Sequence, residues 1–416
     1  HMITLNANLK FVKLLTNKLI IAAEDLVIIK TIKDPNDLND ITDLSLNMLM
    51  VKIDDAEEIV DLKIQEREDY AIIVGSNHTL FSIDLNSESP EATLLKFKHK
   101  VLSVEFSTIS SDVIYIGFDD FDKSHIVKYN FKTRKAIQKI EKDIDIPGSL
   151  EPISLLELNE YELLVSYDLS GKAKDGDRFQ DMALSSPRYT SYVINFKDVS
   201  NVTTSQVDEE LCFNLDDAER DFMNCSVRLR DWEICGKKDE LFLITTSVAS
   251  YISIFKHDQI VVPKDDALKA SMPMDPVEFD DLLVCGLALD LVSSNTPITI
   301  PNVEDPVLGK TMSLWLFATN GMLAKYDFFD VDAIKSGKQF TNIDYQLKLL
   351  KDLRMIQESG SRIDAPVVSS ALTKGSLLSP ADEKNVAPSA FGSANTGGLF
   401  GKSTDNGIAN NSGSLF

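Results

Sequence analysis

Short stretches of alternating apolar and polar residues recur along the chain, and each is followed by a polar turn and a second such stretch. Six pairs fit this description: KLIIAAEDLVIIK (18–30), YAIIVGSNHTLFSIDL (70–85), DVIYIGFDDFDKSHIVKYNF (112–131), YELLVSY with TSYVINF (161–167 and 190–196), ELFLITTSVASYISIF (240–255) and SLWLFATNGMLAKYDFF (313–329). Period-two alternation of β-branched and aromatic residues, interrupted by Gly, Asn, Asp or Ser, predicts β-hairpins.

Five of the six hairpins have a further short apolar strand just before them: EIVDLKI, VLSVEF, PISLLELN, CSVRLRDWEI and VCGLALDLV. A strand, a hairpin and a weaker outer strand together describe a four-stranded blade. The hairpins begin 52, 42, 49, 79 and 73 residues apart, and blades of β-propellers repeat at roughly 40–50 residues. The sequence therefore predicts an all-β fold, a degenerate β-propeller with insertions. A pair of β-sandwich domains is the alternative, because its strands give similar local signals.

The pattern divides the chain into three parts. We expect the propeller to span 3–340. Ile343, Leu347, Leu350, Leu353 and Ile356 recur near helical spacing, which predicts an amphipathic helix over 343–357 and a helical extension over 341–359. From residue 360 to 416 Ser, Gly, Ala, Asn and Pro dominate, and such a segment is expected to be disordered because it buries too little apolar surface to offset its ordering entropy.

Two long insertions interrupt the blade pattern. The first, 168–188, is polar, and we expect it to be mobile. The second, 256–281, contains PKDDALKA, in which a proline and two acids suit the first turn of a short helix. Long charged loops with their own local structure often carry function, although a plug that covers a blade edge is the structural alternative.

Charge narrows the possible partners. The chain has 65 acidic and 42 basic side chains and a formal net charge of −23. Phosphate contacts require a basic surface, so direct nucleic-acid binding is not expected. A basic protein partner would instead be attracted by this field. No apolar run reaches the length of a membrane span, and no membrane partner is expected.

Motifs for chemistry are missing from the sequence. It contains neither a GxxxxGK[ST] run nor a GxGxxG after a strand, and its four cysteines include no CxxC pair. We therefore predict no catalytic residue, no metal ligand and no cofactor, with the cysteines buried and reduced. A propeller hydrolase stays open as an alternative, since it needs only two carboxylates that converge from separate elements.

Clusters of acidic residues in the predicted loops are the most distinctive feature. They are Asp119, Asp120 and Asp122; Asp208, Glu209 and Glu210; Asp216, Asp217 and Glu219; Asp265 and Asp266; and Asp275, Glu278, Asp280 and Asp281. Each cluster alone is more often a solvated loop than a contact. Gathered on one rim, they would form a docking surface for an arginine-rich patch, where charge-assisted hydrogen bonds fix the register.

Residues 285–298 (CGLALDLVSSNTPI) and 314–337 (LWLFATNGMLAKYDFFDVDAIKSG) resemble the last blade of the fungal cytoplasmic-filament FG nucleoporins, the counterparts of the vertebrate CAN nucleoporin. Residues 70–85 and 240–255 look like earlier blades of the same domain. A propeller followed by Phe391-Gly392 and by Phe400-Gly401, the latter within GLFG, is also typical of an FG nucleoporin.

The resemblance implies a seven-bladed ring, whose seventh blade is expected either within 198–224 or before residue 10. It implies a location in the nuclear pore complex at the cytoplasmic face, contacts with other nucleoporins, and binding of the DEAD-box ATPase of mRNA export through the loop before the last blade. The partner contacts carried over to this sequence are Asp265, Asp266 and Leu268, then Asp275 and Glu278; Asp119 and Asp120 are added on charge alone.

Isolated phenylalanines in the tail are expected to bind transport receptors weakly and to gain strength from their number. These residues are Phe391, Phe400 and Phe416. A structural coat-type scaffold propeller is the alternative from another binding class. It would expose apolar patches on its rim and form complexes that salt does not weaken.

Overall fold

The computed structural model describes the strand-rich part of the chain. The described residues are 9–33, 38–45, 47–54, 56, 58–119, 125–141, 151–168, 189–207, 222–234, 237–247, 249, 251–256, 259–261, 268–274, 282–290, 297–298, 307–308 and 312–328. Within them no helix is long and apolar enough to cross a membrane.

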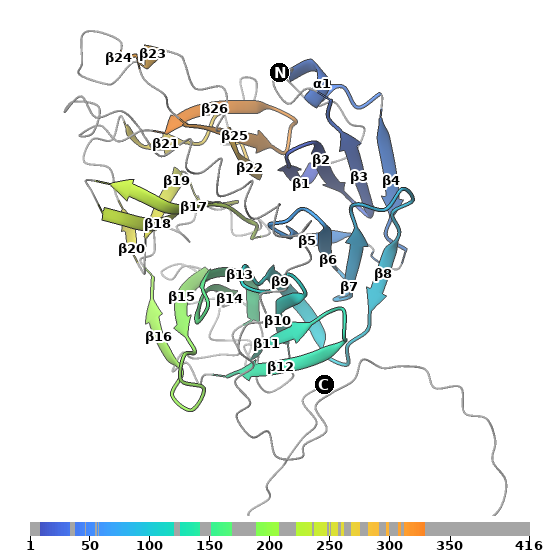
Figure 1. Ribbon diagram of the computed structural model, residues 1–416, viewed down its shortest axis with the longest axis vertical. Helices are drawn as coiled ribbons and strands as arrows, with labels where there is room; N and C mark the ends of the chain where they lie inside the picture. Colours follow the sequence, from blue (N-terminus) through green and yellow to red (C-terminus); the bar gives the residue numbers. More distant parts are fainter. Residues whose placement is uncertain are drawn as a thin grey trace, which may run out of the picture.

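Strands that follow one another in the chain pair into antiparallel sheets, and each principal sheet is one blade (Figure 1). Blade 1 contains β1 (Leu9–Leu14), β2 (Lys18–Ala23), β3 (Leu26–Thr31) and β4 (Met48–Lys52), with helix α1 (Leu38–Thr42) between the last two. Blade 2 contains β5 (Ile59–Ile64), β6 (Tyr70–Gly75), β7 (Leu80–Asp84) and β8 (Ala92–Leu95). Blade 3 contains β9 (Lys100–Phe106), β10 (Val113–Asp119), β11 (His125–Asn130) and β12 (Lys135–Ile140).

The second half repeats the plan with insertions. Blade 4 contains β13 (Glu151–Asn159), β14 (Glu162–Asp168), β15 (Tyr189–Asn195) and β16 (Thr203–Gln206). Blade 5 contains β17 (Asn224–Ile234), β18 (Lys237–Thr246), β19 (Tyr251–Lys256) and β20 (Gln259–Val261), and β21 (Ala270–Ser271) pairs with β19. Blade 6 contains β22 (Val284–Asp290), β25 (Met312–Ala318) and β26 (Leu323–Phe328), and the short strands β23 (Pro297–Ile298) and β24 (Val307–Leu308) pair with each other.

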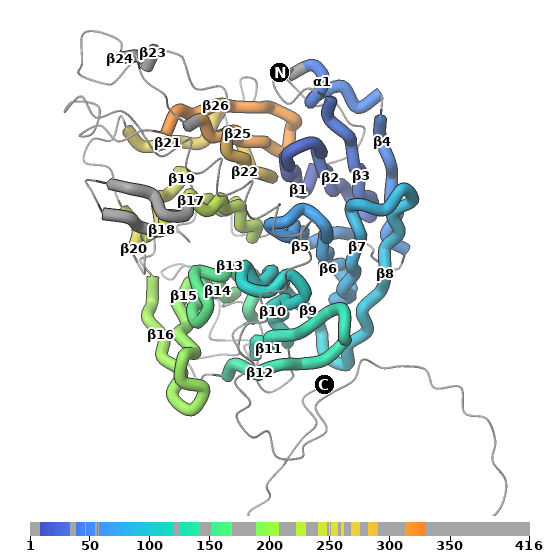
Figure 2. The backbone as a smooth tube through the Cα atoms, in the orientation of Figure 1, coloured from blue at the N-terminus to red at the C-terminus, as the bar shows by residue number. Residues whose placement is uncertain are grey.

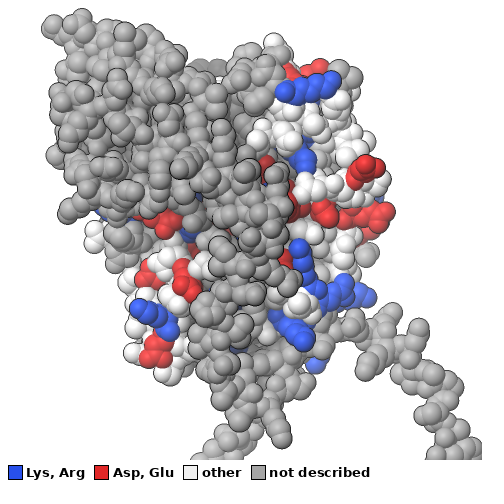
Figure 3. Space-filling view, viewed as in Figure 1, with Lys and Arg blue, Asp and Glu red and all other residues white. Residues whose placement is uncertain are grey.

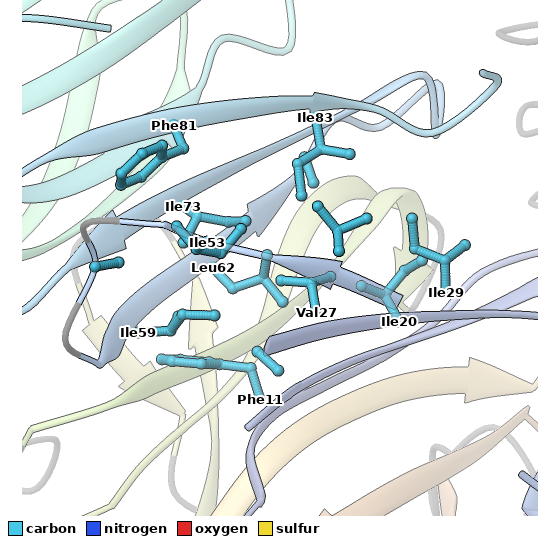
Figure 4. Close-up of a cluster of buried hydrophobic side chains, with 14 of the residues drawn as sticks. Phe11, Ile20, Val27, Ile29, Ile53, Ile59, Leu62, Ile73, Phe81 and Ile83 are labelled. Carbon is cyan, nitrogen blue, oxygen red and sulfur yellow. The ribbon is translucent and has the colours of Figure 1, made fainter. Parts of the chain in front are cut away.

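Apolar side chains bury themselves between neighbouring blades. In the cluster between blades 1 and 2, for example, Phe11 and Val27 pack with Leu62, Ile73 and Phe81 (Figure 4). Similar clusters join blades 2 and 3, 3 and 4, 4 and 5, and 5 and 6. The strands of a blade have both faces covered, because each blade lies between two others, and this explains their long apolar runs.

The ring closes directly between blade 6 and blade 1. Val12 and Ile21 of blade 1 share a buried cluster with Cys285, Ala288 and Phe317 of blade 6, and the two blades lie side by side in the backbone trace (Figure 2). Six blades therefore complete the ring formed by the described residues. The prediction of seven blades was wrong, because blade 6 packs directly against blade 1 and leaves no place for another blade between them. That prediction came from the family resemblance, since the sequence itself shows only six hairpins.

The predicted hairpins are confirmed. The sheets are arranged in a closed ring, so the fold is a propeller and not a pair of β-sandwich domains. The prediction missed β1, which precedes the first hairpin and supplies the inner strand of blade 1, and the short strands β21, β23 and β24. The region 198–224 holds no additional blade in its described part, because Thr203–Gln206 is the outer strand of blade 4. The insertion 169–188, the helix expected over 343–357 with its extension, and the tail 360–416 lie outside the described residues.

Candidate partner-binding surface

Antiparallel pairing sorts the connections of the ring onto two faces. The β2–β3 and β6–β7 turns lie on the same face as the links that lead into β5 and β9, because Ile59 N donates to Glu24 O (2.8 Å) and Val101 N donates to His78 O (3.2 Å). We call this the connection face. The β5–β6 and β9–β10 turns lie on the opposite face, where Gln65 Nε2 donates to Ser111 O.

The acid-rich segments of the sequence leave from the described strand ends of the connection face. They connect β10 to β11, β16 to β17, and β20 through β21 to β22. The segments themselves, including Asp120, Asp265, Asp266, Asp275 and Glu278, lie outside the described residues. Topology alone thus brings the starting points of the predicted acidic clusters to one side of the ring, although the first leaves from Asp119 and the last from Val261.

Asp119 does not lie in a loop as its sequence suggested. It is the last residue of β10, pairs in register with Lys100 of β9, and is 8% exposed. Burial lowers the pKa of the nearby His78, and the charge of Asp119 is among the effects that oppose this shift. Strand β10 runs through the first acid of GFDDFD, so this carboxylate faces protein groups more than solvent.

Leu268 belongs to a segment that is fixed at the seam of blades 5 and 6. In this segment, 268–274, β21 pairs with β19, Met272 is buried among residues of both blades, and Ser271 O accepts a hydrogen bond from Tyr326 OH (2.7 Å). Leu282 N also donates to Pro273 O (3.0 Å). Leu268 itself is half-buried. The two acid-rich stretches of the insertion therefore flank an anchored segment.

Exposed apolar side chains accompany this anchored segment. Tyr251 of β19 is 45% exposed and Met274 is 55% exposed. Lys269 Nζ lies 5.3 Å from the centre of the Tyr251 ring. Tyrosine and methionine are enriched in protein interfaces, and neither residue carried a signal in the sequence that separated it from a core position.

The described surface carries both signs of charge. In the view of Figure 3, acidic and basic side chains are interspersed, and basic ones gather over the blades formed by β5–β8 and β9–β12. On this face the described strands and turns therefore do not make a continuous acidic surface (Figure 3).

A polar network that the sequence did not reveal ties blades 3, 4 and 5 together near the ring centre. Glu157 of β13 is 1% exposed and accepts hydrogen bonds from Ser107 Oγ (3.0 Å), Tyr115 OH (3.1 Å) and Thr108 N (2.6 Å). Burial, followed by the Glu157 charge, raises the pKa of Tyr115, so this hydroxyl stays a donor. A buried carboxylate with this many donors is satisfied and structural.

Arg228 of β17 extends the network across the next seam. Its guanidinium donates to Leu158 O (3.0 Å) and Glu157 O in blade 4, and to Thr108 Oγ1 (3.1 Å) in blade 3. Its Nε lies 3.2 Å from Glu240 Oε1 within its own blade. One planar cation thereby connects three blades, which suits the fixed fork of donors in arginine.

Two carboxylates converge near the centre, as the hydrolase alternative required. Asp61 and Glu105 lie on the inner strands β5 and β9, and burial raises the pKa of each. Lys63 Nζ lies 3.5 Å from Glu105 Oε2. Burial opposes protonation of Lys63, but the charges of Asp61 and Glu105 outweigh it and raise the lysine pKa. Each carboxylate also accepts a backbone N–H, from Val104 and Phe106 respectively, so the group is arranged as a buried ion-pair network.

Among the described residues, no three His, Cys, Asp or Glu side chains lie close enough together to hold a metal ion. Cys225 and Cys285 are free and buried, as predicted. Burial raises the pKa of both thiols, which keeps them protonated. Cys212 and Cys235 lie outside the described residues.

Fold and surface together define a β-propeller with a rigid, ion-paired centre whose charged connections leave from one face. The family model described as the NUP159/214 beta propeller matches residues 9–323. The chain belongs to this family of nucleoporin propellers, which confirms the resemblance seen in the blade sequences.

Solved structures agree at the level of the fold. A complex described as S. cerevisiae Dbp5 bound to Nup159, Gle1, IP6 and ADP matches with 14% identity and a TM-score of 0.54, covering 78% of this chain and 76% of the matched chain. The N-terminal domain of Nup159 matches with 13% identity and a TM-score of 0.52, covering 76% of this chain and 75% of the matched chain. No curated protein sequence matches the chain significantly.

Proposed function

We propose that this nucleoporin propeller is a non-enzymatic docking platform that binds the DEAD-box ATPase of mRNA export at the cytoplasmic side of the nuclear pore. The single observation that carries the proposal is the segment 268–274, which is anchored at the seam of blades 5 and 6 and is flanked in the sequence by the acidic residues of the insertion. The structurally similar Nup159 has been solved in a complex with Dbp5, which supports a partner of this class.

The proposed contact combines charge with an apolar centre. Asp265 and Asp266 precede the anchored segment, and Asp275 and Glu278 follow it, with Leu268 at its start. Carboxylates of this kind pair with arginine and lysine of the partner and speed the encounter, while the apolar residues bury surface. Asp120 is a weaker candidate from blade 3, and Asp119 contributes mainly by its charge because it is buried.

Bound in this way, the propeller would occupy a basic surface that the ATPase otherwise uses to hold RNA. Binding of the propeller and binding of RNA would then compete, and docking would promote release of the exported message. The acidic chain is not expected to bind the RNA itself, since its net charge of −23 repels a polyanion.

Charge reversal at Asp265 and Asp266 tests the contact. The full chain carrying Asp265→Lys and Asp266→Lys is titrated with a purified DEAD-box ATPase of the Dbp5 class at two salt concentrations. We expect the affinity to fall at least tenfold, mostly through slower association at low salt. The matched control carries Glu88→Lys and Glu91→Lys in the exposed β7–β8 turn, which has the same change of charge on the opposite face. Equal affinity of the two variants would exclude the proposed contact.

The C-terminal phenylalanines give the platform a second role. Phe391, Phe400 and Phe416 would each enter a small apolar pocket of a transport receptor, and several such tails at the pore would add avidity. Replacing the three by serine should abolish capture by an importin-type receptor without changing binding of the ATPase. Retained capture would show that these phenylalanines are not the binding residues.

A scaffold function, with other nucleoporins as partners, is favoured by one observation. Leu49 and Met50 on the outer edge strand β4 are 42% and 63% exposed, and exposed apolar edges often mark contacts between proteins. Replacing both residues by Thr would weaken such an assembly and leave binding of the ATPase unchanged. A stable complex with another nucleoporin that resists high salt and depends on these two residues would favour the scaffold.

A further inference from the structure

A row of lysines stands out on this acidic protein. In Lys96-Phe97-Lys98-His99-Lys100, which leads from β8 of blade 2 into β9 of blade 3, the three lysines are exposed and the two residues between them are half-buried. We call Lys96, Lys98 and Lys100 the lysine row. It lies on the connection face, because Val101 N in the next position donates to His78 O of the β6–β7 turn.

The backbone that carries the lysine row is held in place by aromatic packing. The Phe97 ring contacts the rings of Phe118 and Tyr129 edge to face, with centres 5.4 and 5.1 Å apart. The His99 ring lies 6.0 Å from the ring of His125. Since every second side chain is packed against blade 3, the lysines project from a fixed base, and less backbone entropy is lost when they bind.

The lysines of the row are not paired with carboxylates in the described part of the molecule. Lys10, Lys52 and Lys63 each pair with a carboxylate, whereas the three lysines of the row form no ion pair with the residues that the structure describes. Three exposed cations within five residues repel one another, and a protein with a net charge of −23 supplies many carboxylates that would relieve this repulsion at little cost. Three ammonium groups at this spacing are suited to bind an external anion.

We propose that the lysine row is a second docking site that binds an acidic peptide segment of a partner protein. Peptide carboxylates would pair with the three ammonium groups in a contact that is independent of the acidic insertion at blades 5 and 6. The platform then offers opposite charges at two places on one face, so that basic and acidic partners bind side by side.

The surroundings favour an acidic peptide over single-stranded nucleic acid. Proteins that bind single strands stack bases on exposed aromatic rings, and the aromatic rings of this segment turn inward onto Phe118, Tyr129 and His125. A long polyanion would also meet the repulsive field of the whole chain, while a short peptide covers only the row.

Binding of a fluorescent oligoglutamate peptide to the full chain tests the site, with oligoglutamine as the neutral control probe and anisotropy as the readout. We expect the unmodified chain to bind oligoglutamate at low ionic strength and not oligoglutamine. The variant Lys96→Ser, Lys98→Ser, Lys100→Ser should bind about tenfold more weakly. Because all three side chains are exposed, its unfolding midpoint should match that of the unmodified chain.

A control with dispersed charges separates the row from net charge. The variant Lys33→Ser, Lys135→Ser, Lys197→Ser removes three exposed lysines from other parts of the surface, and it should bind oligoglutamate within twofold of the unmodified chain. Equal losses in both variants would reduce the effect to net charge and overturn the proposal. Absence of oligoglutamate binding, or tighter binding of an oligouridylate through the same lysines, would overturn it as well.

Discussion

Gly286 at the start of the last blade lies directly against the backbone of Val12 in the first: a Cβ added to this glycine would be 1.9 Å from the Val12 carbonyl oxygen. At this contact the first and last blades of the described ring meet, and the ring closes. Only a residue without a side chain allows the inner strands β22 and β1 to come so close.

The first prediction concerns this closure. Gly286→Ala should lower the free energy of unfolding by at least about 2 kcal/mol, because the neighbour is backbone and cannot rotate away. Urea denaturation followed by tryptophan fluorescence measures the change. Ala324→Gly on β26, at a half-buried position of the same blade, should cost only about 1 kcal/mol. A Gly286→Ala protein as stable as the unmodified chain would mean that the blades close less tightly than described.

The second prediction concerns the carboxylate that joins blades 3 and 4. Glu157→Ala should destabilise the protein by about 3 kcal/mol, because the hydroxyls of Ser107, Thr108 and Tyr115 lose their shared acceptor in a buried site. The neighbouring exposed Glu160 is the control, and Glu160→Ala should change stability by less than about 0.5 kcal/mol. Equal effects of the two substitutions in a denaturant titration would contradict the network.

The third prediction concerns the buried cation between two carboxylates. Lys63→Met should destabilise the protein by about 3–5 kcal/mol at neutral pH, because it removes the strongest positive charge acting on the buried Asp61 and Glu105. Lys52→Met, which removes an exposed lysine 3.6 Å from the half-buried Asp25, is the control and should have little effect.

The pH dependence of this destabilisation has a defined sign. Burial raises the pKa of Asp61 and of Glu105 in the folded state, so above the ordinary carboxyl pKa of about 4 the folded state binds more protons than the unfolded chain. In the Lys63→Met variant, stability should therefore fall as the pH rises from about 4 toward neutrality, and the difference from the unmodified chain should shrink on acidification. A constant difference between pH 5 and pH 8 would argue against this protonation.

The fourth prediction concerns the thiols. Burial raises the pKa of Cys225 and Cys285, so the reactive thiolate is rare at neutral pH and both sulfurs are shielded. A short pulse of iodoacetamide followed by peptide mapping should leave these two unmodified in the native protein and label them after denaturation. Rapid native labelling of either residue would show that blades 5 and 6 open.

Sequence by itself determined the strands, the hairpins and the class of fold. Alternation such as that of residues 70–85 is a local property, because neighbouring side chains of a strand must point to opposite faces. The spacing of hairpins then indicated blades, and the residues of the last blade indicated the family, which the family model confirms. The residues proposed to contact that partner stay predictions, since most of them lie outside the described residues.

Tertiary structure decided what depends on contacts between distant blades. The contact of Gly286 with Val12 set the number of blades that close the ring. Asp119 is buried at the end of β10, although the acidic run around it in the sequence indicated a loop. Tertiary structure also brought Arg228 to Leu158, 70 residues away in the chain. Such pairings follow from how twisted sheets pack around an axis, and no periodicity within one strand specifies which neighbour its polar side chains will meet.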